Sequence, residues 1–224
     1  MRISHLFILL AASAMLTACD FLDEYNPNSV TVGNYYTSEE DIVASLNGVY
    51  TSLTQSYVAD NYHYFTDVRA NATVVTNSGA NSGIPYQFYN YTLTEENVYV
   101  YNRYSQLYKI ISRANTLFAH LGDVSYATPS ARDTYEAEAR FLRALSYYWL
   151  VTEWGDVPLV LKVLESTEEV RANNYRRPKA EIYQAIFDDL KYVTESPLLD
   201  VQPASACGKV SNCLLYTAPS PRDA

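Results

Sequence analysis

The sequence of 224 residues has few of the residues on which several protein classes depend. It holds 3 His and 3 Cys, with no CxxC or His-rich spacing, so we expect no metal site. Its 7 Gly are too few for an all-β sandwich built on glycine turns. Basic residues number 16 against 25 acidic ones, a formal net charge of −9. Such an acidic chain lacks the electrostatic footprint of nucleic-acid binding, which excludes that class.

Common catalytic and cofactor-binding motifs are also absent. The sequence has no G-x-S-x-G, H-E-x-x-H, Walker glycine loop or G-x-G-x-x-G. Pairs of Asp and Glu are plentiful, but any two of them fit a glycosidase equally well, so they carry little specificity. We therefore expect no catalytic residue and no cofactor, and a binding protein is favoured over an enzyme.

Tyrosine is the residue in excess. The chain has 22 Tyr against 7 Phe and 2 Trp, within a globular composition of 48% hydrophobic and 18% charged residues. A tyrosine ring has an apolar body and a polar tip, so it suits binding faces as well as cores. The excess alone therefore does not distinguish a binding face or a wet surface from a core.

Residues 1–18 are interpreted as a signal peptide. A basic start at Arg2 precedes a short apolar run, which is too short to span a bilayer. The sequence then reads Leu-Thr-Ala before Cys19, which resembles a bacterial lipobox, where the thiol of the cysteine receives a lipid. We expect Cys19 to be the lipidation site of a membrane-anchored protein. The alternative is an ordinary signal peptide followed by a chance cysteine.

The other two cysteines, Cys207 and Cys213, lie six residues apart near the C-terminus. An exported protein can pair them, but two cysteines in a loop-like tail leave the pairing open.

Hydrophobic spacing predicts at least four long helices. Residues 19–36 carry turn formers and no period, and are interpreted as an extended tether. Four helices are expected, at about residues 37–53, 98–120, 128–154, and from Pro178 to just before Pro197. Thr37 and Glu40 are expected to form a capping box at the start of the first helix. In the last of the four helices, Asp188, Asp189 and Lys191 are expected to face water. Residues 58–98, between the first two helices, form a long Tyr-rich stretch. An irregular segment of this length in a compact domain is usually functional or contains short helices or strands.

Several sequence blocks, in order, carry a family resemblance. After the lipobox come YYTSEED with LNGVY, then YSQLYKIISRAN, then AEARFLRALSYYWL leading into WGDVPLV, and last RPKAEIY with DDL. Over residues 16–200 the chain resembles the N-terminal part of the SusD/RagB family of nutrient-binding outer-membrane lipoproteins of Bacteroidetes. The resemblance implies an all-α, tetratricopeptide-like α-solenoid with long irregular loops, which is incomplete at the C-terminus. Residues 37–211 would be its truncated helical domain.

The last residues depart from this pattern. Where the resemblance implies another helix after Ser211, the chain has Pro219 and Pro221, which forbid one. Residues 212–224 resemble translated adaptor sequence and are interpreted as a non-native tail. The alternative is a genuine short C-terminus.

The resemblance also implies a function. Such proteins capture an oligosaccharide or another nutrient at the outer membrane, facing the exterior, and deliver it to a SusC-like TonB-dependent transporter. The ligand candidates in the Tyr-rich stretch are Asp67, Arg69, Asn71, Tyr86, Tyr89 and Tyr91, with Tyr62, Tyr64 and Phe88 beside them. The alternative for each of these aromatic residues is that its ring packs in the core of the segment. A surface scaffold for protein partners and a surface glycan hydrolase remain alternatives.

Two arginines in the third expected helix allow two interpretations. Arg140 and Arg143 lie on an otherwise apolar helix, so we expect them to pair with carboxylates or with carbonyls at helix ends. The alternative is that they bind ligand.

Overall fold

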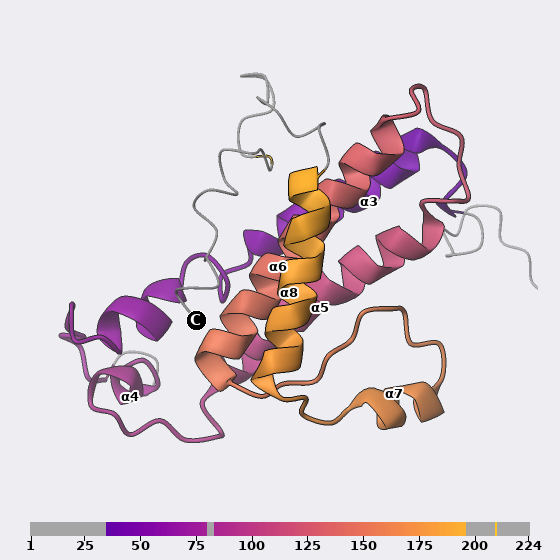
Figure 1. Ribbon diagram of the computed structural model, residues 1–224. Helices are drawn as coiled ribbons and strands as arrows, with labels where there is room; N and C mark the ends of the chain where they lie inside the picture. The colour runs from indigo at the N-terminus through magenta and orange to yellow at the C-terminus, as the bar shows by residue number, and fades with distance from the viewer. Residues whose placement is uncertain (1–34, 80–82, 196–208, 210–224) are drawn as a thin grey trace, which may run out of the picture. The chain divides into compact units, whose positions relative to one another are not determined.

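The computed structural model describes residues 35–79, 83–195 and 209 of the chain (Figure 1). The signal peptide, Cys19, nearly all of the tether, Pro197 and the other two cysteines lie outside these residues, as does the tail. The described residues from Tyr36 on belong to one compact unit.

The described residues contain helices and no strand. The long helices are α3 (Glu39–Leu53), α5 (Val98–His120), α6 (Ala131–Trp154) and α8 (Lys179–Glu195). Three short elements join them: a π-helical turn η2 (Tyr64–Val68), α4 (Tyr86–Tyr89) and α7 (Thr167–Asn173). The expected all-α class and the four long helices are confirmed, whereas η2, α4 and α7 were not individually predicted.

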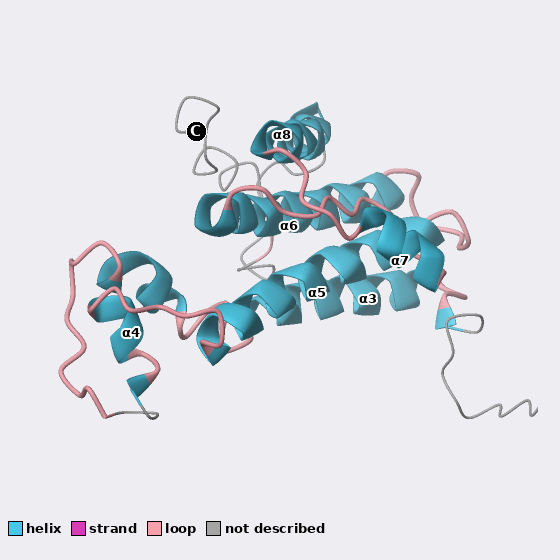
Figure 2. Ribbon diagram, turned by 90° about the horizontal axis from the view of Figure 1, so that it is seen from below, coloured by secondary structure: helices cyan, strands magenta, loops and turns pink. Residues whose placement is uncertain are grey.

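The long helices pack as neighbours in a fixed order. Helix α5 contacts α3 on one side and α6 on the other, and α6 also packs against α8 (Figure 2). The shared core is a set of fully buried aliphatic side chains, among them Ile42, Leu46, Leu107, Ile111, Leu142, Leu150, Ile182 and Val193. Within each helix they are separated by four, eight or eleven residues, which are whole numbers of turns, and this helical period is the pattern from which the helices were predicted.

Helix ends are fixed by local chemistry, not always where the sequence placed them. The cap of α3 is Ser38, not Thr37, and the Asp41 carboxylate accepts from the Ser38 amide at 2.9 Å. Helix α5 begins at the predicted residue because the Asn97 side chain accepts from the amides of Tyr99 and Val100. Helix α6 starts at Ala131, later than predicted, and ends where Gly155 takes φ +74°.

Polar side chains tie the helices together inside this core. The Arg143 guanidinium donates to both carboxylate oxygens of Asp189 at 2.8 and 2.7 Å, and to Asn115 Oδ1 at 2.7 Å. Arg140 binds the same Asp189 and also Glu136. The prediction that both arginines pair with carboxylates is thus confirmed. The prediction that Asp189 faces water is wrong, because this residue is buried in the seam between α6 and α8.

Two further side chains are more exposed than helical spacing alone predicts. Tyr101 precedes Tyr104 by three residues on α5 and so would share the apolar face, but it is 68% exposed. Leu145 follows Phe141 by four residues on α6, but it is only partly buried, while Leu142 is fully buried. Both misplaced residues lie at the edge of an apolar stripe, where one step along the helix moves a side chain by about 100°.

Candidate ligand-binding site

The Tyr-rich segment, residues 58–98, folds over one end of the helices around a second, aromatic core. Phe65 and Val68 of η2, Phe88 of α4 and Tyr99 of α5 are buried together. The rings of Phe65 and Phe88 meet edge to face with centroids 4.9 Å apart, and those of Tyr64 and Tyr99 do so at 5.5 Å. An irregular segment is therefore held in place by ring packing.

A buried arginine anchors this segment to the helices. Arg103 of α5 is 0% exposed, and its Nε and Nη2 donate to the two carboxylate oxygens of Glu153 at 2.7 and 2.6 Å. Its Nη1 donates to the carbonyl oxygens of Tyr57 and Val58 at 3.1 and 3.2 Å. The rings of Tyr62, Phe65 and Trp149 lie around the guanidinium, with centroids 5.0, 4.8 and 5.5 Å away. One side chain thus joins α5, α6 and the start of the segment.

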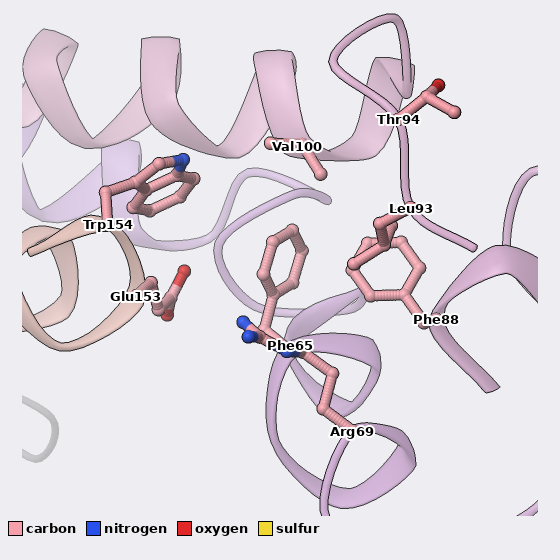
Figure 3. A pocket seen from close by; sticks show the side chains of 8 residues that line it. All are labelled: Phe65, Arg69, Phe88, Leu93, Thr94, Val100, Glu153 and Trp154. Carbon is pink, nitrogen blue, oxygen red and sulfur yellow. The ribbon is translucent and has the colours of Figure 1, made fainter. Parts of the chain in front are cut away.

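Beside this anchor lies a pocket of about 190 Å³, shown in Figure 3. It is lined by Phe65, Arg69, Phe88, Leu93, Thr94, Val100, Glu153 and Trp154. The lining comes from η2, α4, the loop after α4, the start of α5 and the end of α6. The volume is below the roughly 300–1,000 Å³ of sites for drug-sized ligands, so the pocket is sized for one small ring.

Glu153 is the acidic group of the pocket. Burial raises the pKa of its carboxyl, while the hydrogen bonds and charge of Arg103, and the charge of Arg69, act to lower it. Because Arg103 supplies a bidentate pair, the carboxylate is held in one orientation. A fixed acceptor beside aromatic rings can order a ligand that carries hydroxyl groups.

The candidates named from sequence fall into two groups. Arg69 lines the pocket, and Tyr91, 67% exposed, donates from its hydroxyl to the Arg69 carbonyl at 3.0 Å. Tyr86 and Tyr89 are partly buried in α4, with ring centroids 5.5 Å apart, and neither lines the pocket. Asp67 and Asn71 are exposed and also lie outside the lining. The structure therefore joins Arg69 and Tyr91 but does not gather all six candidates at one point.

The three additional residues named from the segment lie mostly in the aromatic core. Phe88 is buried and lines the pocket, and Tyr64 packs against it at 5.7 Å between centroids. Tyr62 lies over Arg103 and next to the Trp149 ring.

Backbone geometry marks two separate turns, each of which carries one of these candidates. Asn71 and Tyr91 both have φ of 58°, in the left-handed region. Asparagine tolerates this conformation, but a tyrosine rarely adopts it, and such outliers gather at functional sites. The hydrogen bond from Tyr91 to the Arg69 carbonyl helps to hold this strained turn beside the pocket.

Sequence reasoning missed the pocket residues from α6. Glu153 and Trp154 were taken only as the end of a helix, yet they form one wall. The available signal was a carboxylate and an indole side by side just before a helix-ending glycine. It could not identify a pocket, because the opposite wall lies some sixty to ninety residues earlier in the chain.

A second hollow of about 230 Å³ lies between α5 and α7. Its lining is largely apolar and includes Tyr104, Tyr108 and Val170, with the amides Asn173 and Asn174 at one edge. It contains no charged side chain, so it offers a ligand less orientation than the pocket at Glu153.

Two kinds of feature are absent from the described residues. No cluster of His, Cys, Asp or Glu suited to a metal ion occurs in residues 35–79 and 83–195. Over the same part of the chain, no helix combines the length and the apolar character that crossing a membrane requires.

Comparison with known proteins identifies similar chains. The profile of a SusD-like family, described as starch-binding and associating with the outer membrane, matches residues 20–199. SusD-like protein P2 of Formosa agariphila is 27% identical over 218 residues, covering 97% of this chain and 42% of the relative. A SusD-like protein of Bacteroides ovatus is 25% identical over 207 residues, 86% of this chain and 35% of the relative. The chain spans less than half the length of these relatives.

Solved structures show the same likeness. A laminarin binding SusD-like protein matches with a TM-score of 0.68 at 27% identity, covering 80% of this chain and 38% of that one. Surface glycan-binding protein A from Bacteroides thetaiotaomicron, in complex with laminarihexaose, matches at 0.66 and 20% identity, covering 80% and 37%. At that identity the second likeness shows the fold alone. The expected tetratricopeptide-like helical fold is confirmed.

Proposed function

The chain belongs to the SusD-like family, described as starch-binding and associating with the outer membrane, and from this premise we propose that it captures a glycan at the cell surface. The expected ligand is an oligosaccharide. The proposed role is binding, not hydrolysis, followed by delivery to a SusC-like TonB-dependent transporter. A lipid on Cys19 would hold the protein on the outer membrane, facing the exterior.

The pocket at Glu153 is the observation that carries the proposal of glycan binding. Sugars present flat C–H faces and many hydroxyls, and the lining supplies both kinds of partner. Phe65, Phe88 and Trp154 offer apolar ring surface. Arg69 offers donors and Glu153 offers acceptors. A similar protein of known structure bears a name that refers to a glycan, since it is called laminarin binding.

A glycan panel tests this proposal. The purified chain is applied to immobilised neutral and acidic oligosaccharides, and bound protein is measured beside release of reducing ends. We expect saturable binding of at least one oligosaccharide without release of reducing ends. Release of reducing ends would favour a hydrolase, and absence of binding across the panel would favour a scaffold for protein partners.

Delivery is tested separately in cells. We expect a SusC-like transporter of the native host to co-purify with the chain after mild detergent extraction. Recovery of the chain without that transporter, under conditions that preserve the transporter's other contacts, would contradict the delivery step.

A further inference from the structure

Arg69 lines the pocket with a charge that no other described residue pairs. Its guanidinium forms no hydrogen bond or ion pair with residues 35–79 or 83–195. Figure 3 shows its nitrogen atoms directed toward the space beside the Phe65 ring. A guanidinium carries five N–H donors, and those of Arg69 are thus available to a group that enters the pocket.

Glu153, the acidic residue of the lining, is already paired. Its two carboxylate oxygens accept from Nε and Nη2 of Arg103 at 2.7 and 2.6 Å, and Arg103 is fully buried. With Glu153 ionised, Arg69 therefore adds one surplus positive charge to the pocket. Burial raises the pKa of the Glu153 carboxyl, and its protonation would only enlarge that surplus.

Acidic residues near the lining do not cancel this surplus by pairing with Arg69. Asp67 is exposed and lies outside the lining. Glu96 also lies outside it, and accepts hydrogen bonds from the Thr94 hydroxyl and from its own amide. The net charge of −9 belongs to the whole chain, and interactions between exposed charges more than about 8 Å apart are largely screened at physiological ionic strength. A group bound in the pocket therefore meets a positive charge.

The backbone that carries Arg69 is held in place. Arg69 directly follows η2, and its carbonyl oxygen accepts from the Tyr91 hydroxyl at 3.0 Å. Phe65 and Val68 of η2 are buried in the aromatic core. The base of the side chain is thus fixed while its guanidinium stays free, so a ligand does not have to order the backbone when it binds.

We propose that the pocket binds a sugar unit that carries an anionic substituent, a carboxylate or a sulfate ester, and that Arg69 holds this group. The planar guanidinium offers two parallel N–H donors to two oxygens of such a group. The rings of Phe65 and Trp154 offer apolar surface to the face of the sugar. Tyr91 acts through Arg69 as a positioning residue. The inference rests on the proposed function, because it names the class of glycan that the same pocket takes.

Matched oligosaccharides test the requirement for an anionic group. Dissociation constants are measured by calorimetry for hexamers of β-1,4-mannose and β-1,4-mannuronate, of α-1,4-galactose and α-1,4-galacturonate, and of β-1,4-galactose with and without a 6-sulfate. We expect the acidic member of at least one pair to bind about tenfold or more tightly than its neutral counterpart, the size of effect that a hydrogen bond to a charged group gives. The carboxylate and sulfate pairs distinguish the two anions.

The outcomes separate the inference from the proposed function. Equal or tighter binding of the neutral member in every bound pair would overturn the inference and leave glycan capture standing. Binding of none of the hexamers would contradict the proposed function, and the inference with it. The preference should also shrink as the salt concentration rises, because it is Coulombic, and a preference that salt left unchanged would exclude the Arg69 charge as its source.

Variants of Arg69 locate the effect. Arg69→Gln should weaken binding of the acidic hexamer about tenfold and so abolish the preference, whereas Arg69→Lys keeps the charge without the planar fork and should retain part of it. Arg171→Gln makes the same change of charge at an exposed residue of α7 outside the lining, and should leave both affinities unchanged. An Arg69→Gln variant that kept the preference would overturn the inference.

Tyr91→Phe tests the positioning residue. It removes the hydrogen bond to the Arg69 carbonyl and keeps the ring, so the preference for the acidic hexamer should fall severalfold. A role in folding alone would instead lower both affinities alike, and an unchanged preference would remove Tyr91 from the site. Far-ultraviolet circular dichroism reports whether each variant is folded. If Tyr91→Phe is not, the hexamer pairs and Arg69→Gln still decide, because Arg69 is exposed.

Discussion

Asp189 is 2% exposed and holds two arginines of the neighbouring helix through one carboxylate. It follows Ile182 by seven residues, so helical geometry places both on the same face of α8. Because aspartate is charged, Asp189 was predicted to face water. Its partners Arg140 and Arg143 lie about fifty positions away in sequence. The prediction that Asp189 faces water was therefore wrong, because the sequence could not show the partners that make burial of this charge tolerable.

The neighbouring Asp188 provides a matched comparison. Asp189→Asn should lower the free energy of unfolding by about 3–5 kcal/mol, because breaking a buried ion pair leaves an uncompensated charge on Arg143. Asp188→Asn should change it by less than about 0.5 kcal/mol, since Asp188 is exposed. Urea unfolding of both variants measures the difference, and equal losses would show that the network contributes no more than a surface charge.

Glu138 offers a test that depends on pH. It is 3% exposed, and burial raises its pKa, although the Tyr50 hydroxyl donates to it at 2.7 Å and the charge of Lys209 acts in the opposite direction. A carboxyl whose pKa is higher in the folded state binds protons more readily there. Its favourable contribution to stability is thus present below the unfolded pKa and is lost as pH rises through the folded pKa.

Glu138→Gln removes this titration and keeps an acceptor for Tyr50. We expect the variant to be more stable than the parent chain at pH 7, and the gain to disappear as the pH falls below the ordinary glutamate value of about 4.3. Urea unfolding at several pH values provides the measurement. A gain that grew toward low pH would have the wrong sign and would contradict the assignment.

At the scale of elements, prediction succeeded where capping and hydrophobic period agreed. Helix α5 has the predicted bounds because Asn97 caps it and its apolar stripe continues without a break to His120. Helix α7 has seven residues and none of them is buried, so it carries no stripe to detect. Only one side of the candidate site could be predicted from the sequence. Arg69 and Phe88 lie in the segment that the excess of tyrosine had marked, but Glu153 and Trp154 join them only through folding.

Gly155 ends α6, and the strain that its backbone conformation would impose on another residue can be tested by substitution. This residue has φ +74° and ψ −118°, which a side chain disfavours, and an added Cβ would meet no atom within 4 Å. Gly155→Ala should therefore cost about 1–3 kcal/mol through backbone strain alone.

Gly122→Ala is the control, because its surroundings are equally open and its φ is not in the left-handed region. We expect that variant to be neutral or slightly stabilised. Thermal unfolding compares the two, and equal melting temperatures would refute the strain.

At the scale of the whole molecule, the chain spans about 40% of the length of its curated relatives. Anchoring to the membrane is tested on the protein in cells. Cys19→Ala should abolish incorporation of a fatty-acid probe and release the protein from the membrane fraction. Acyl chains contribute about 0.8 kcal/mol for each buried CH₂, which is enough for stable anchoring. Cys207→Ala is the control and should label like the parent. Equal labelling of all three proteins would exclude Cys19 as the lipid site.

We propose that glycan capture takes place in the pocket between the Tyr-rich segment and the end of α6. Hydrogen exchange of the backbone, measured with and without a saturating concentration of the oligosaccharide that binds best in the panel, tests this location directly. We expect slower exchange in residues 64–69, 86–94 and 153–154, with no change in α8. Slower exchange confined to α7 and α8, with the pocket segments unaffected, would contradict the account.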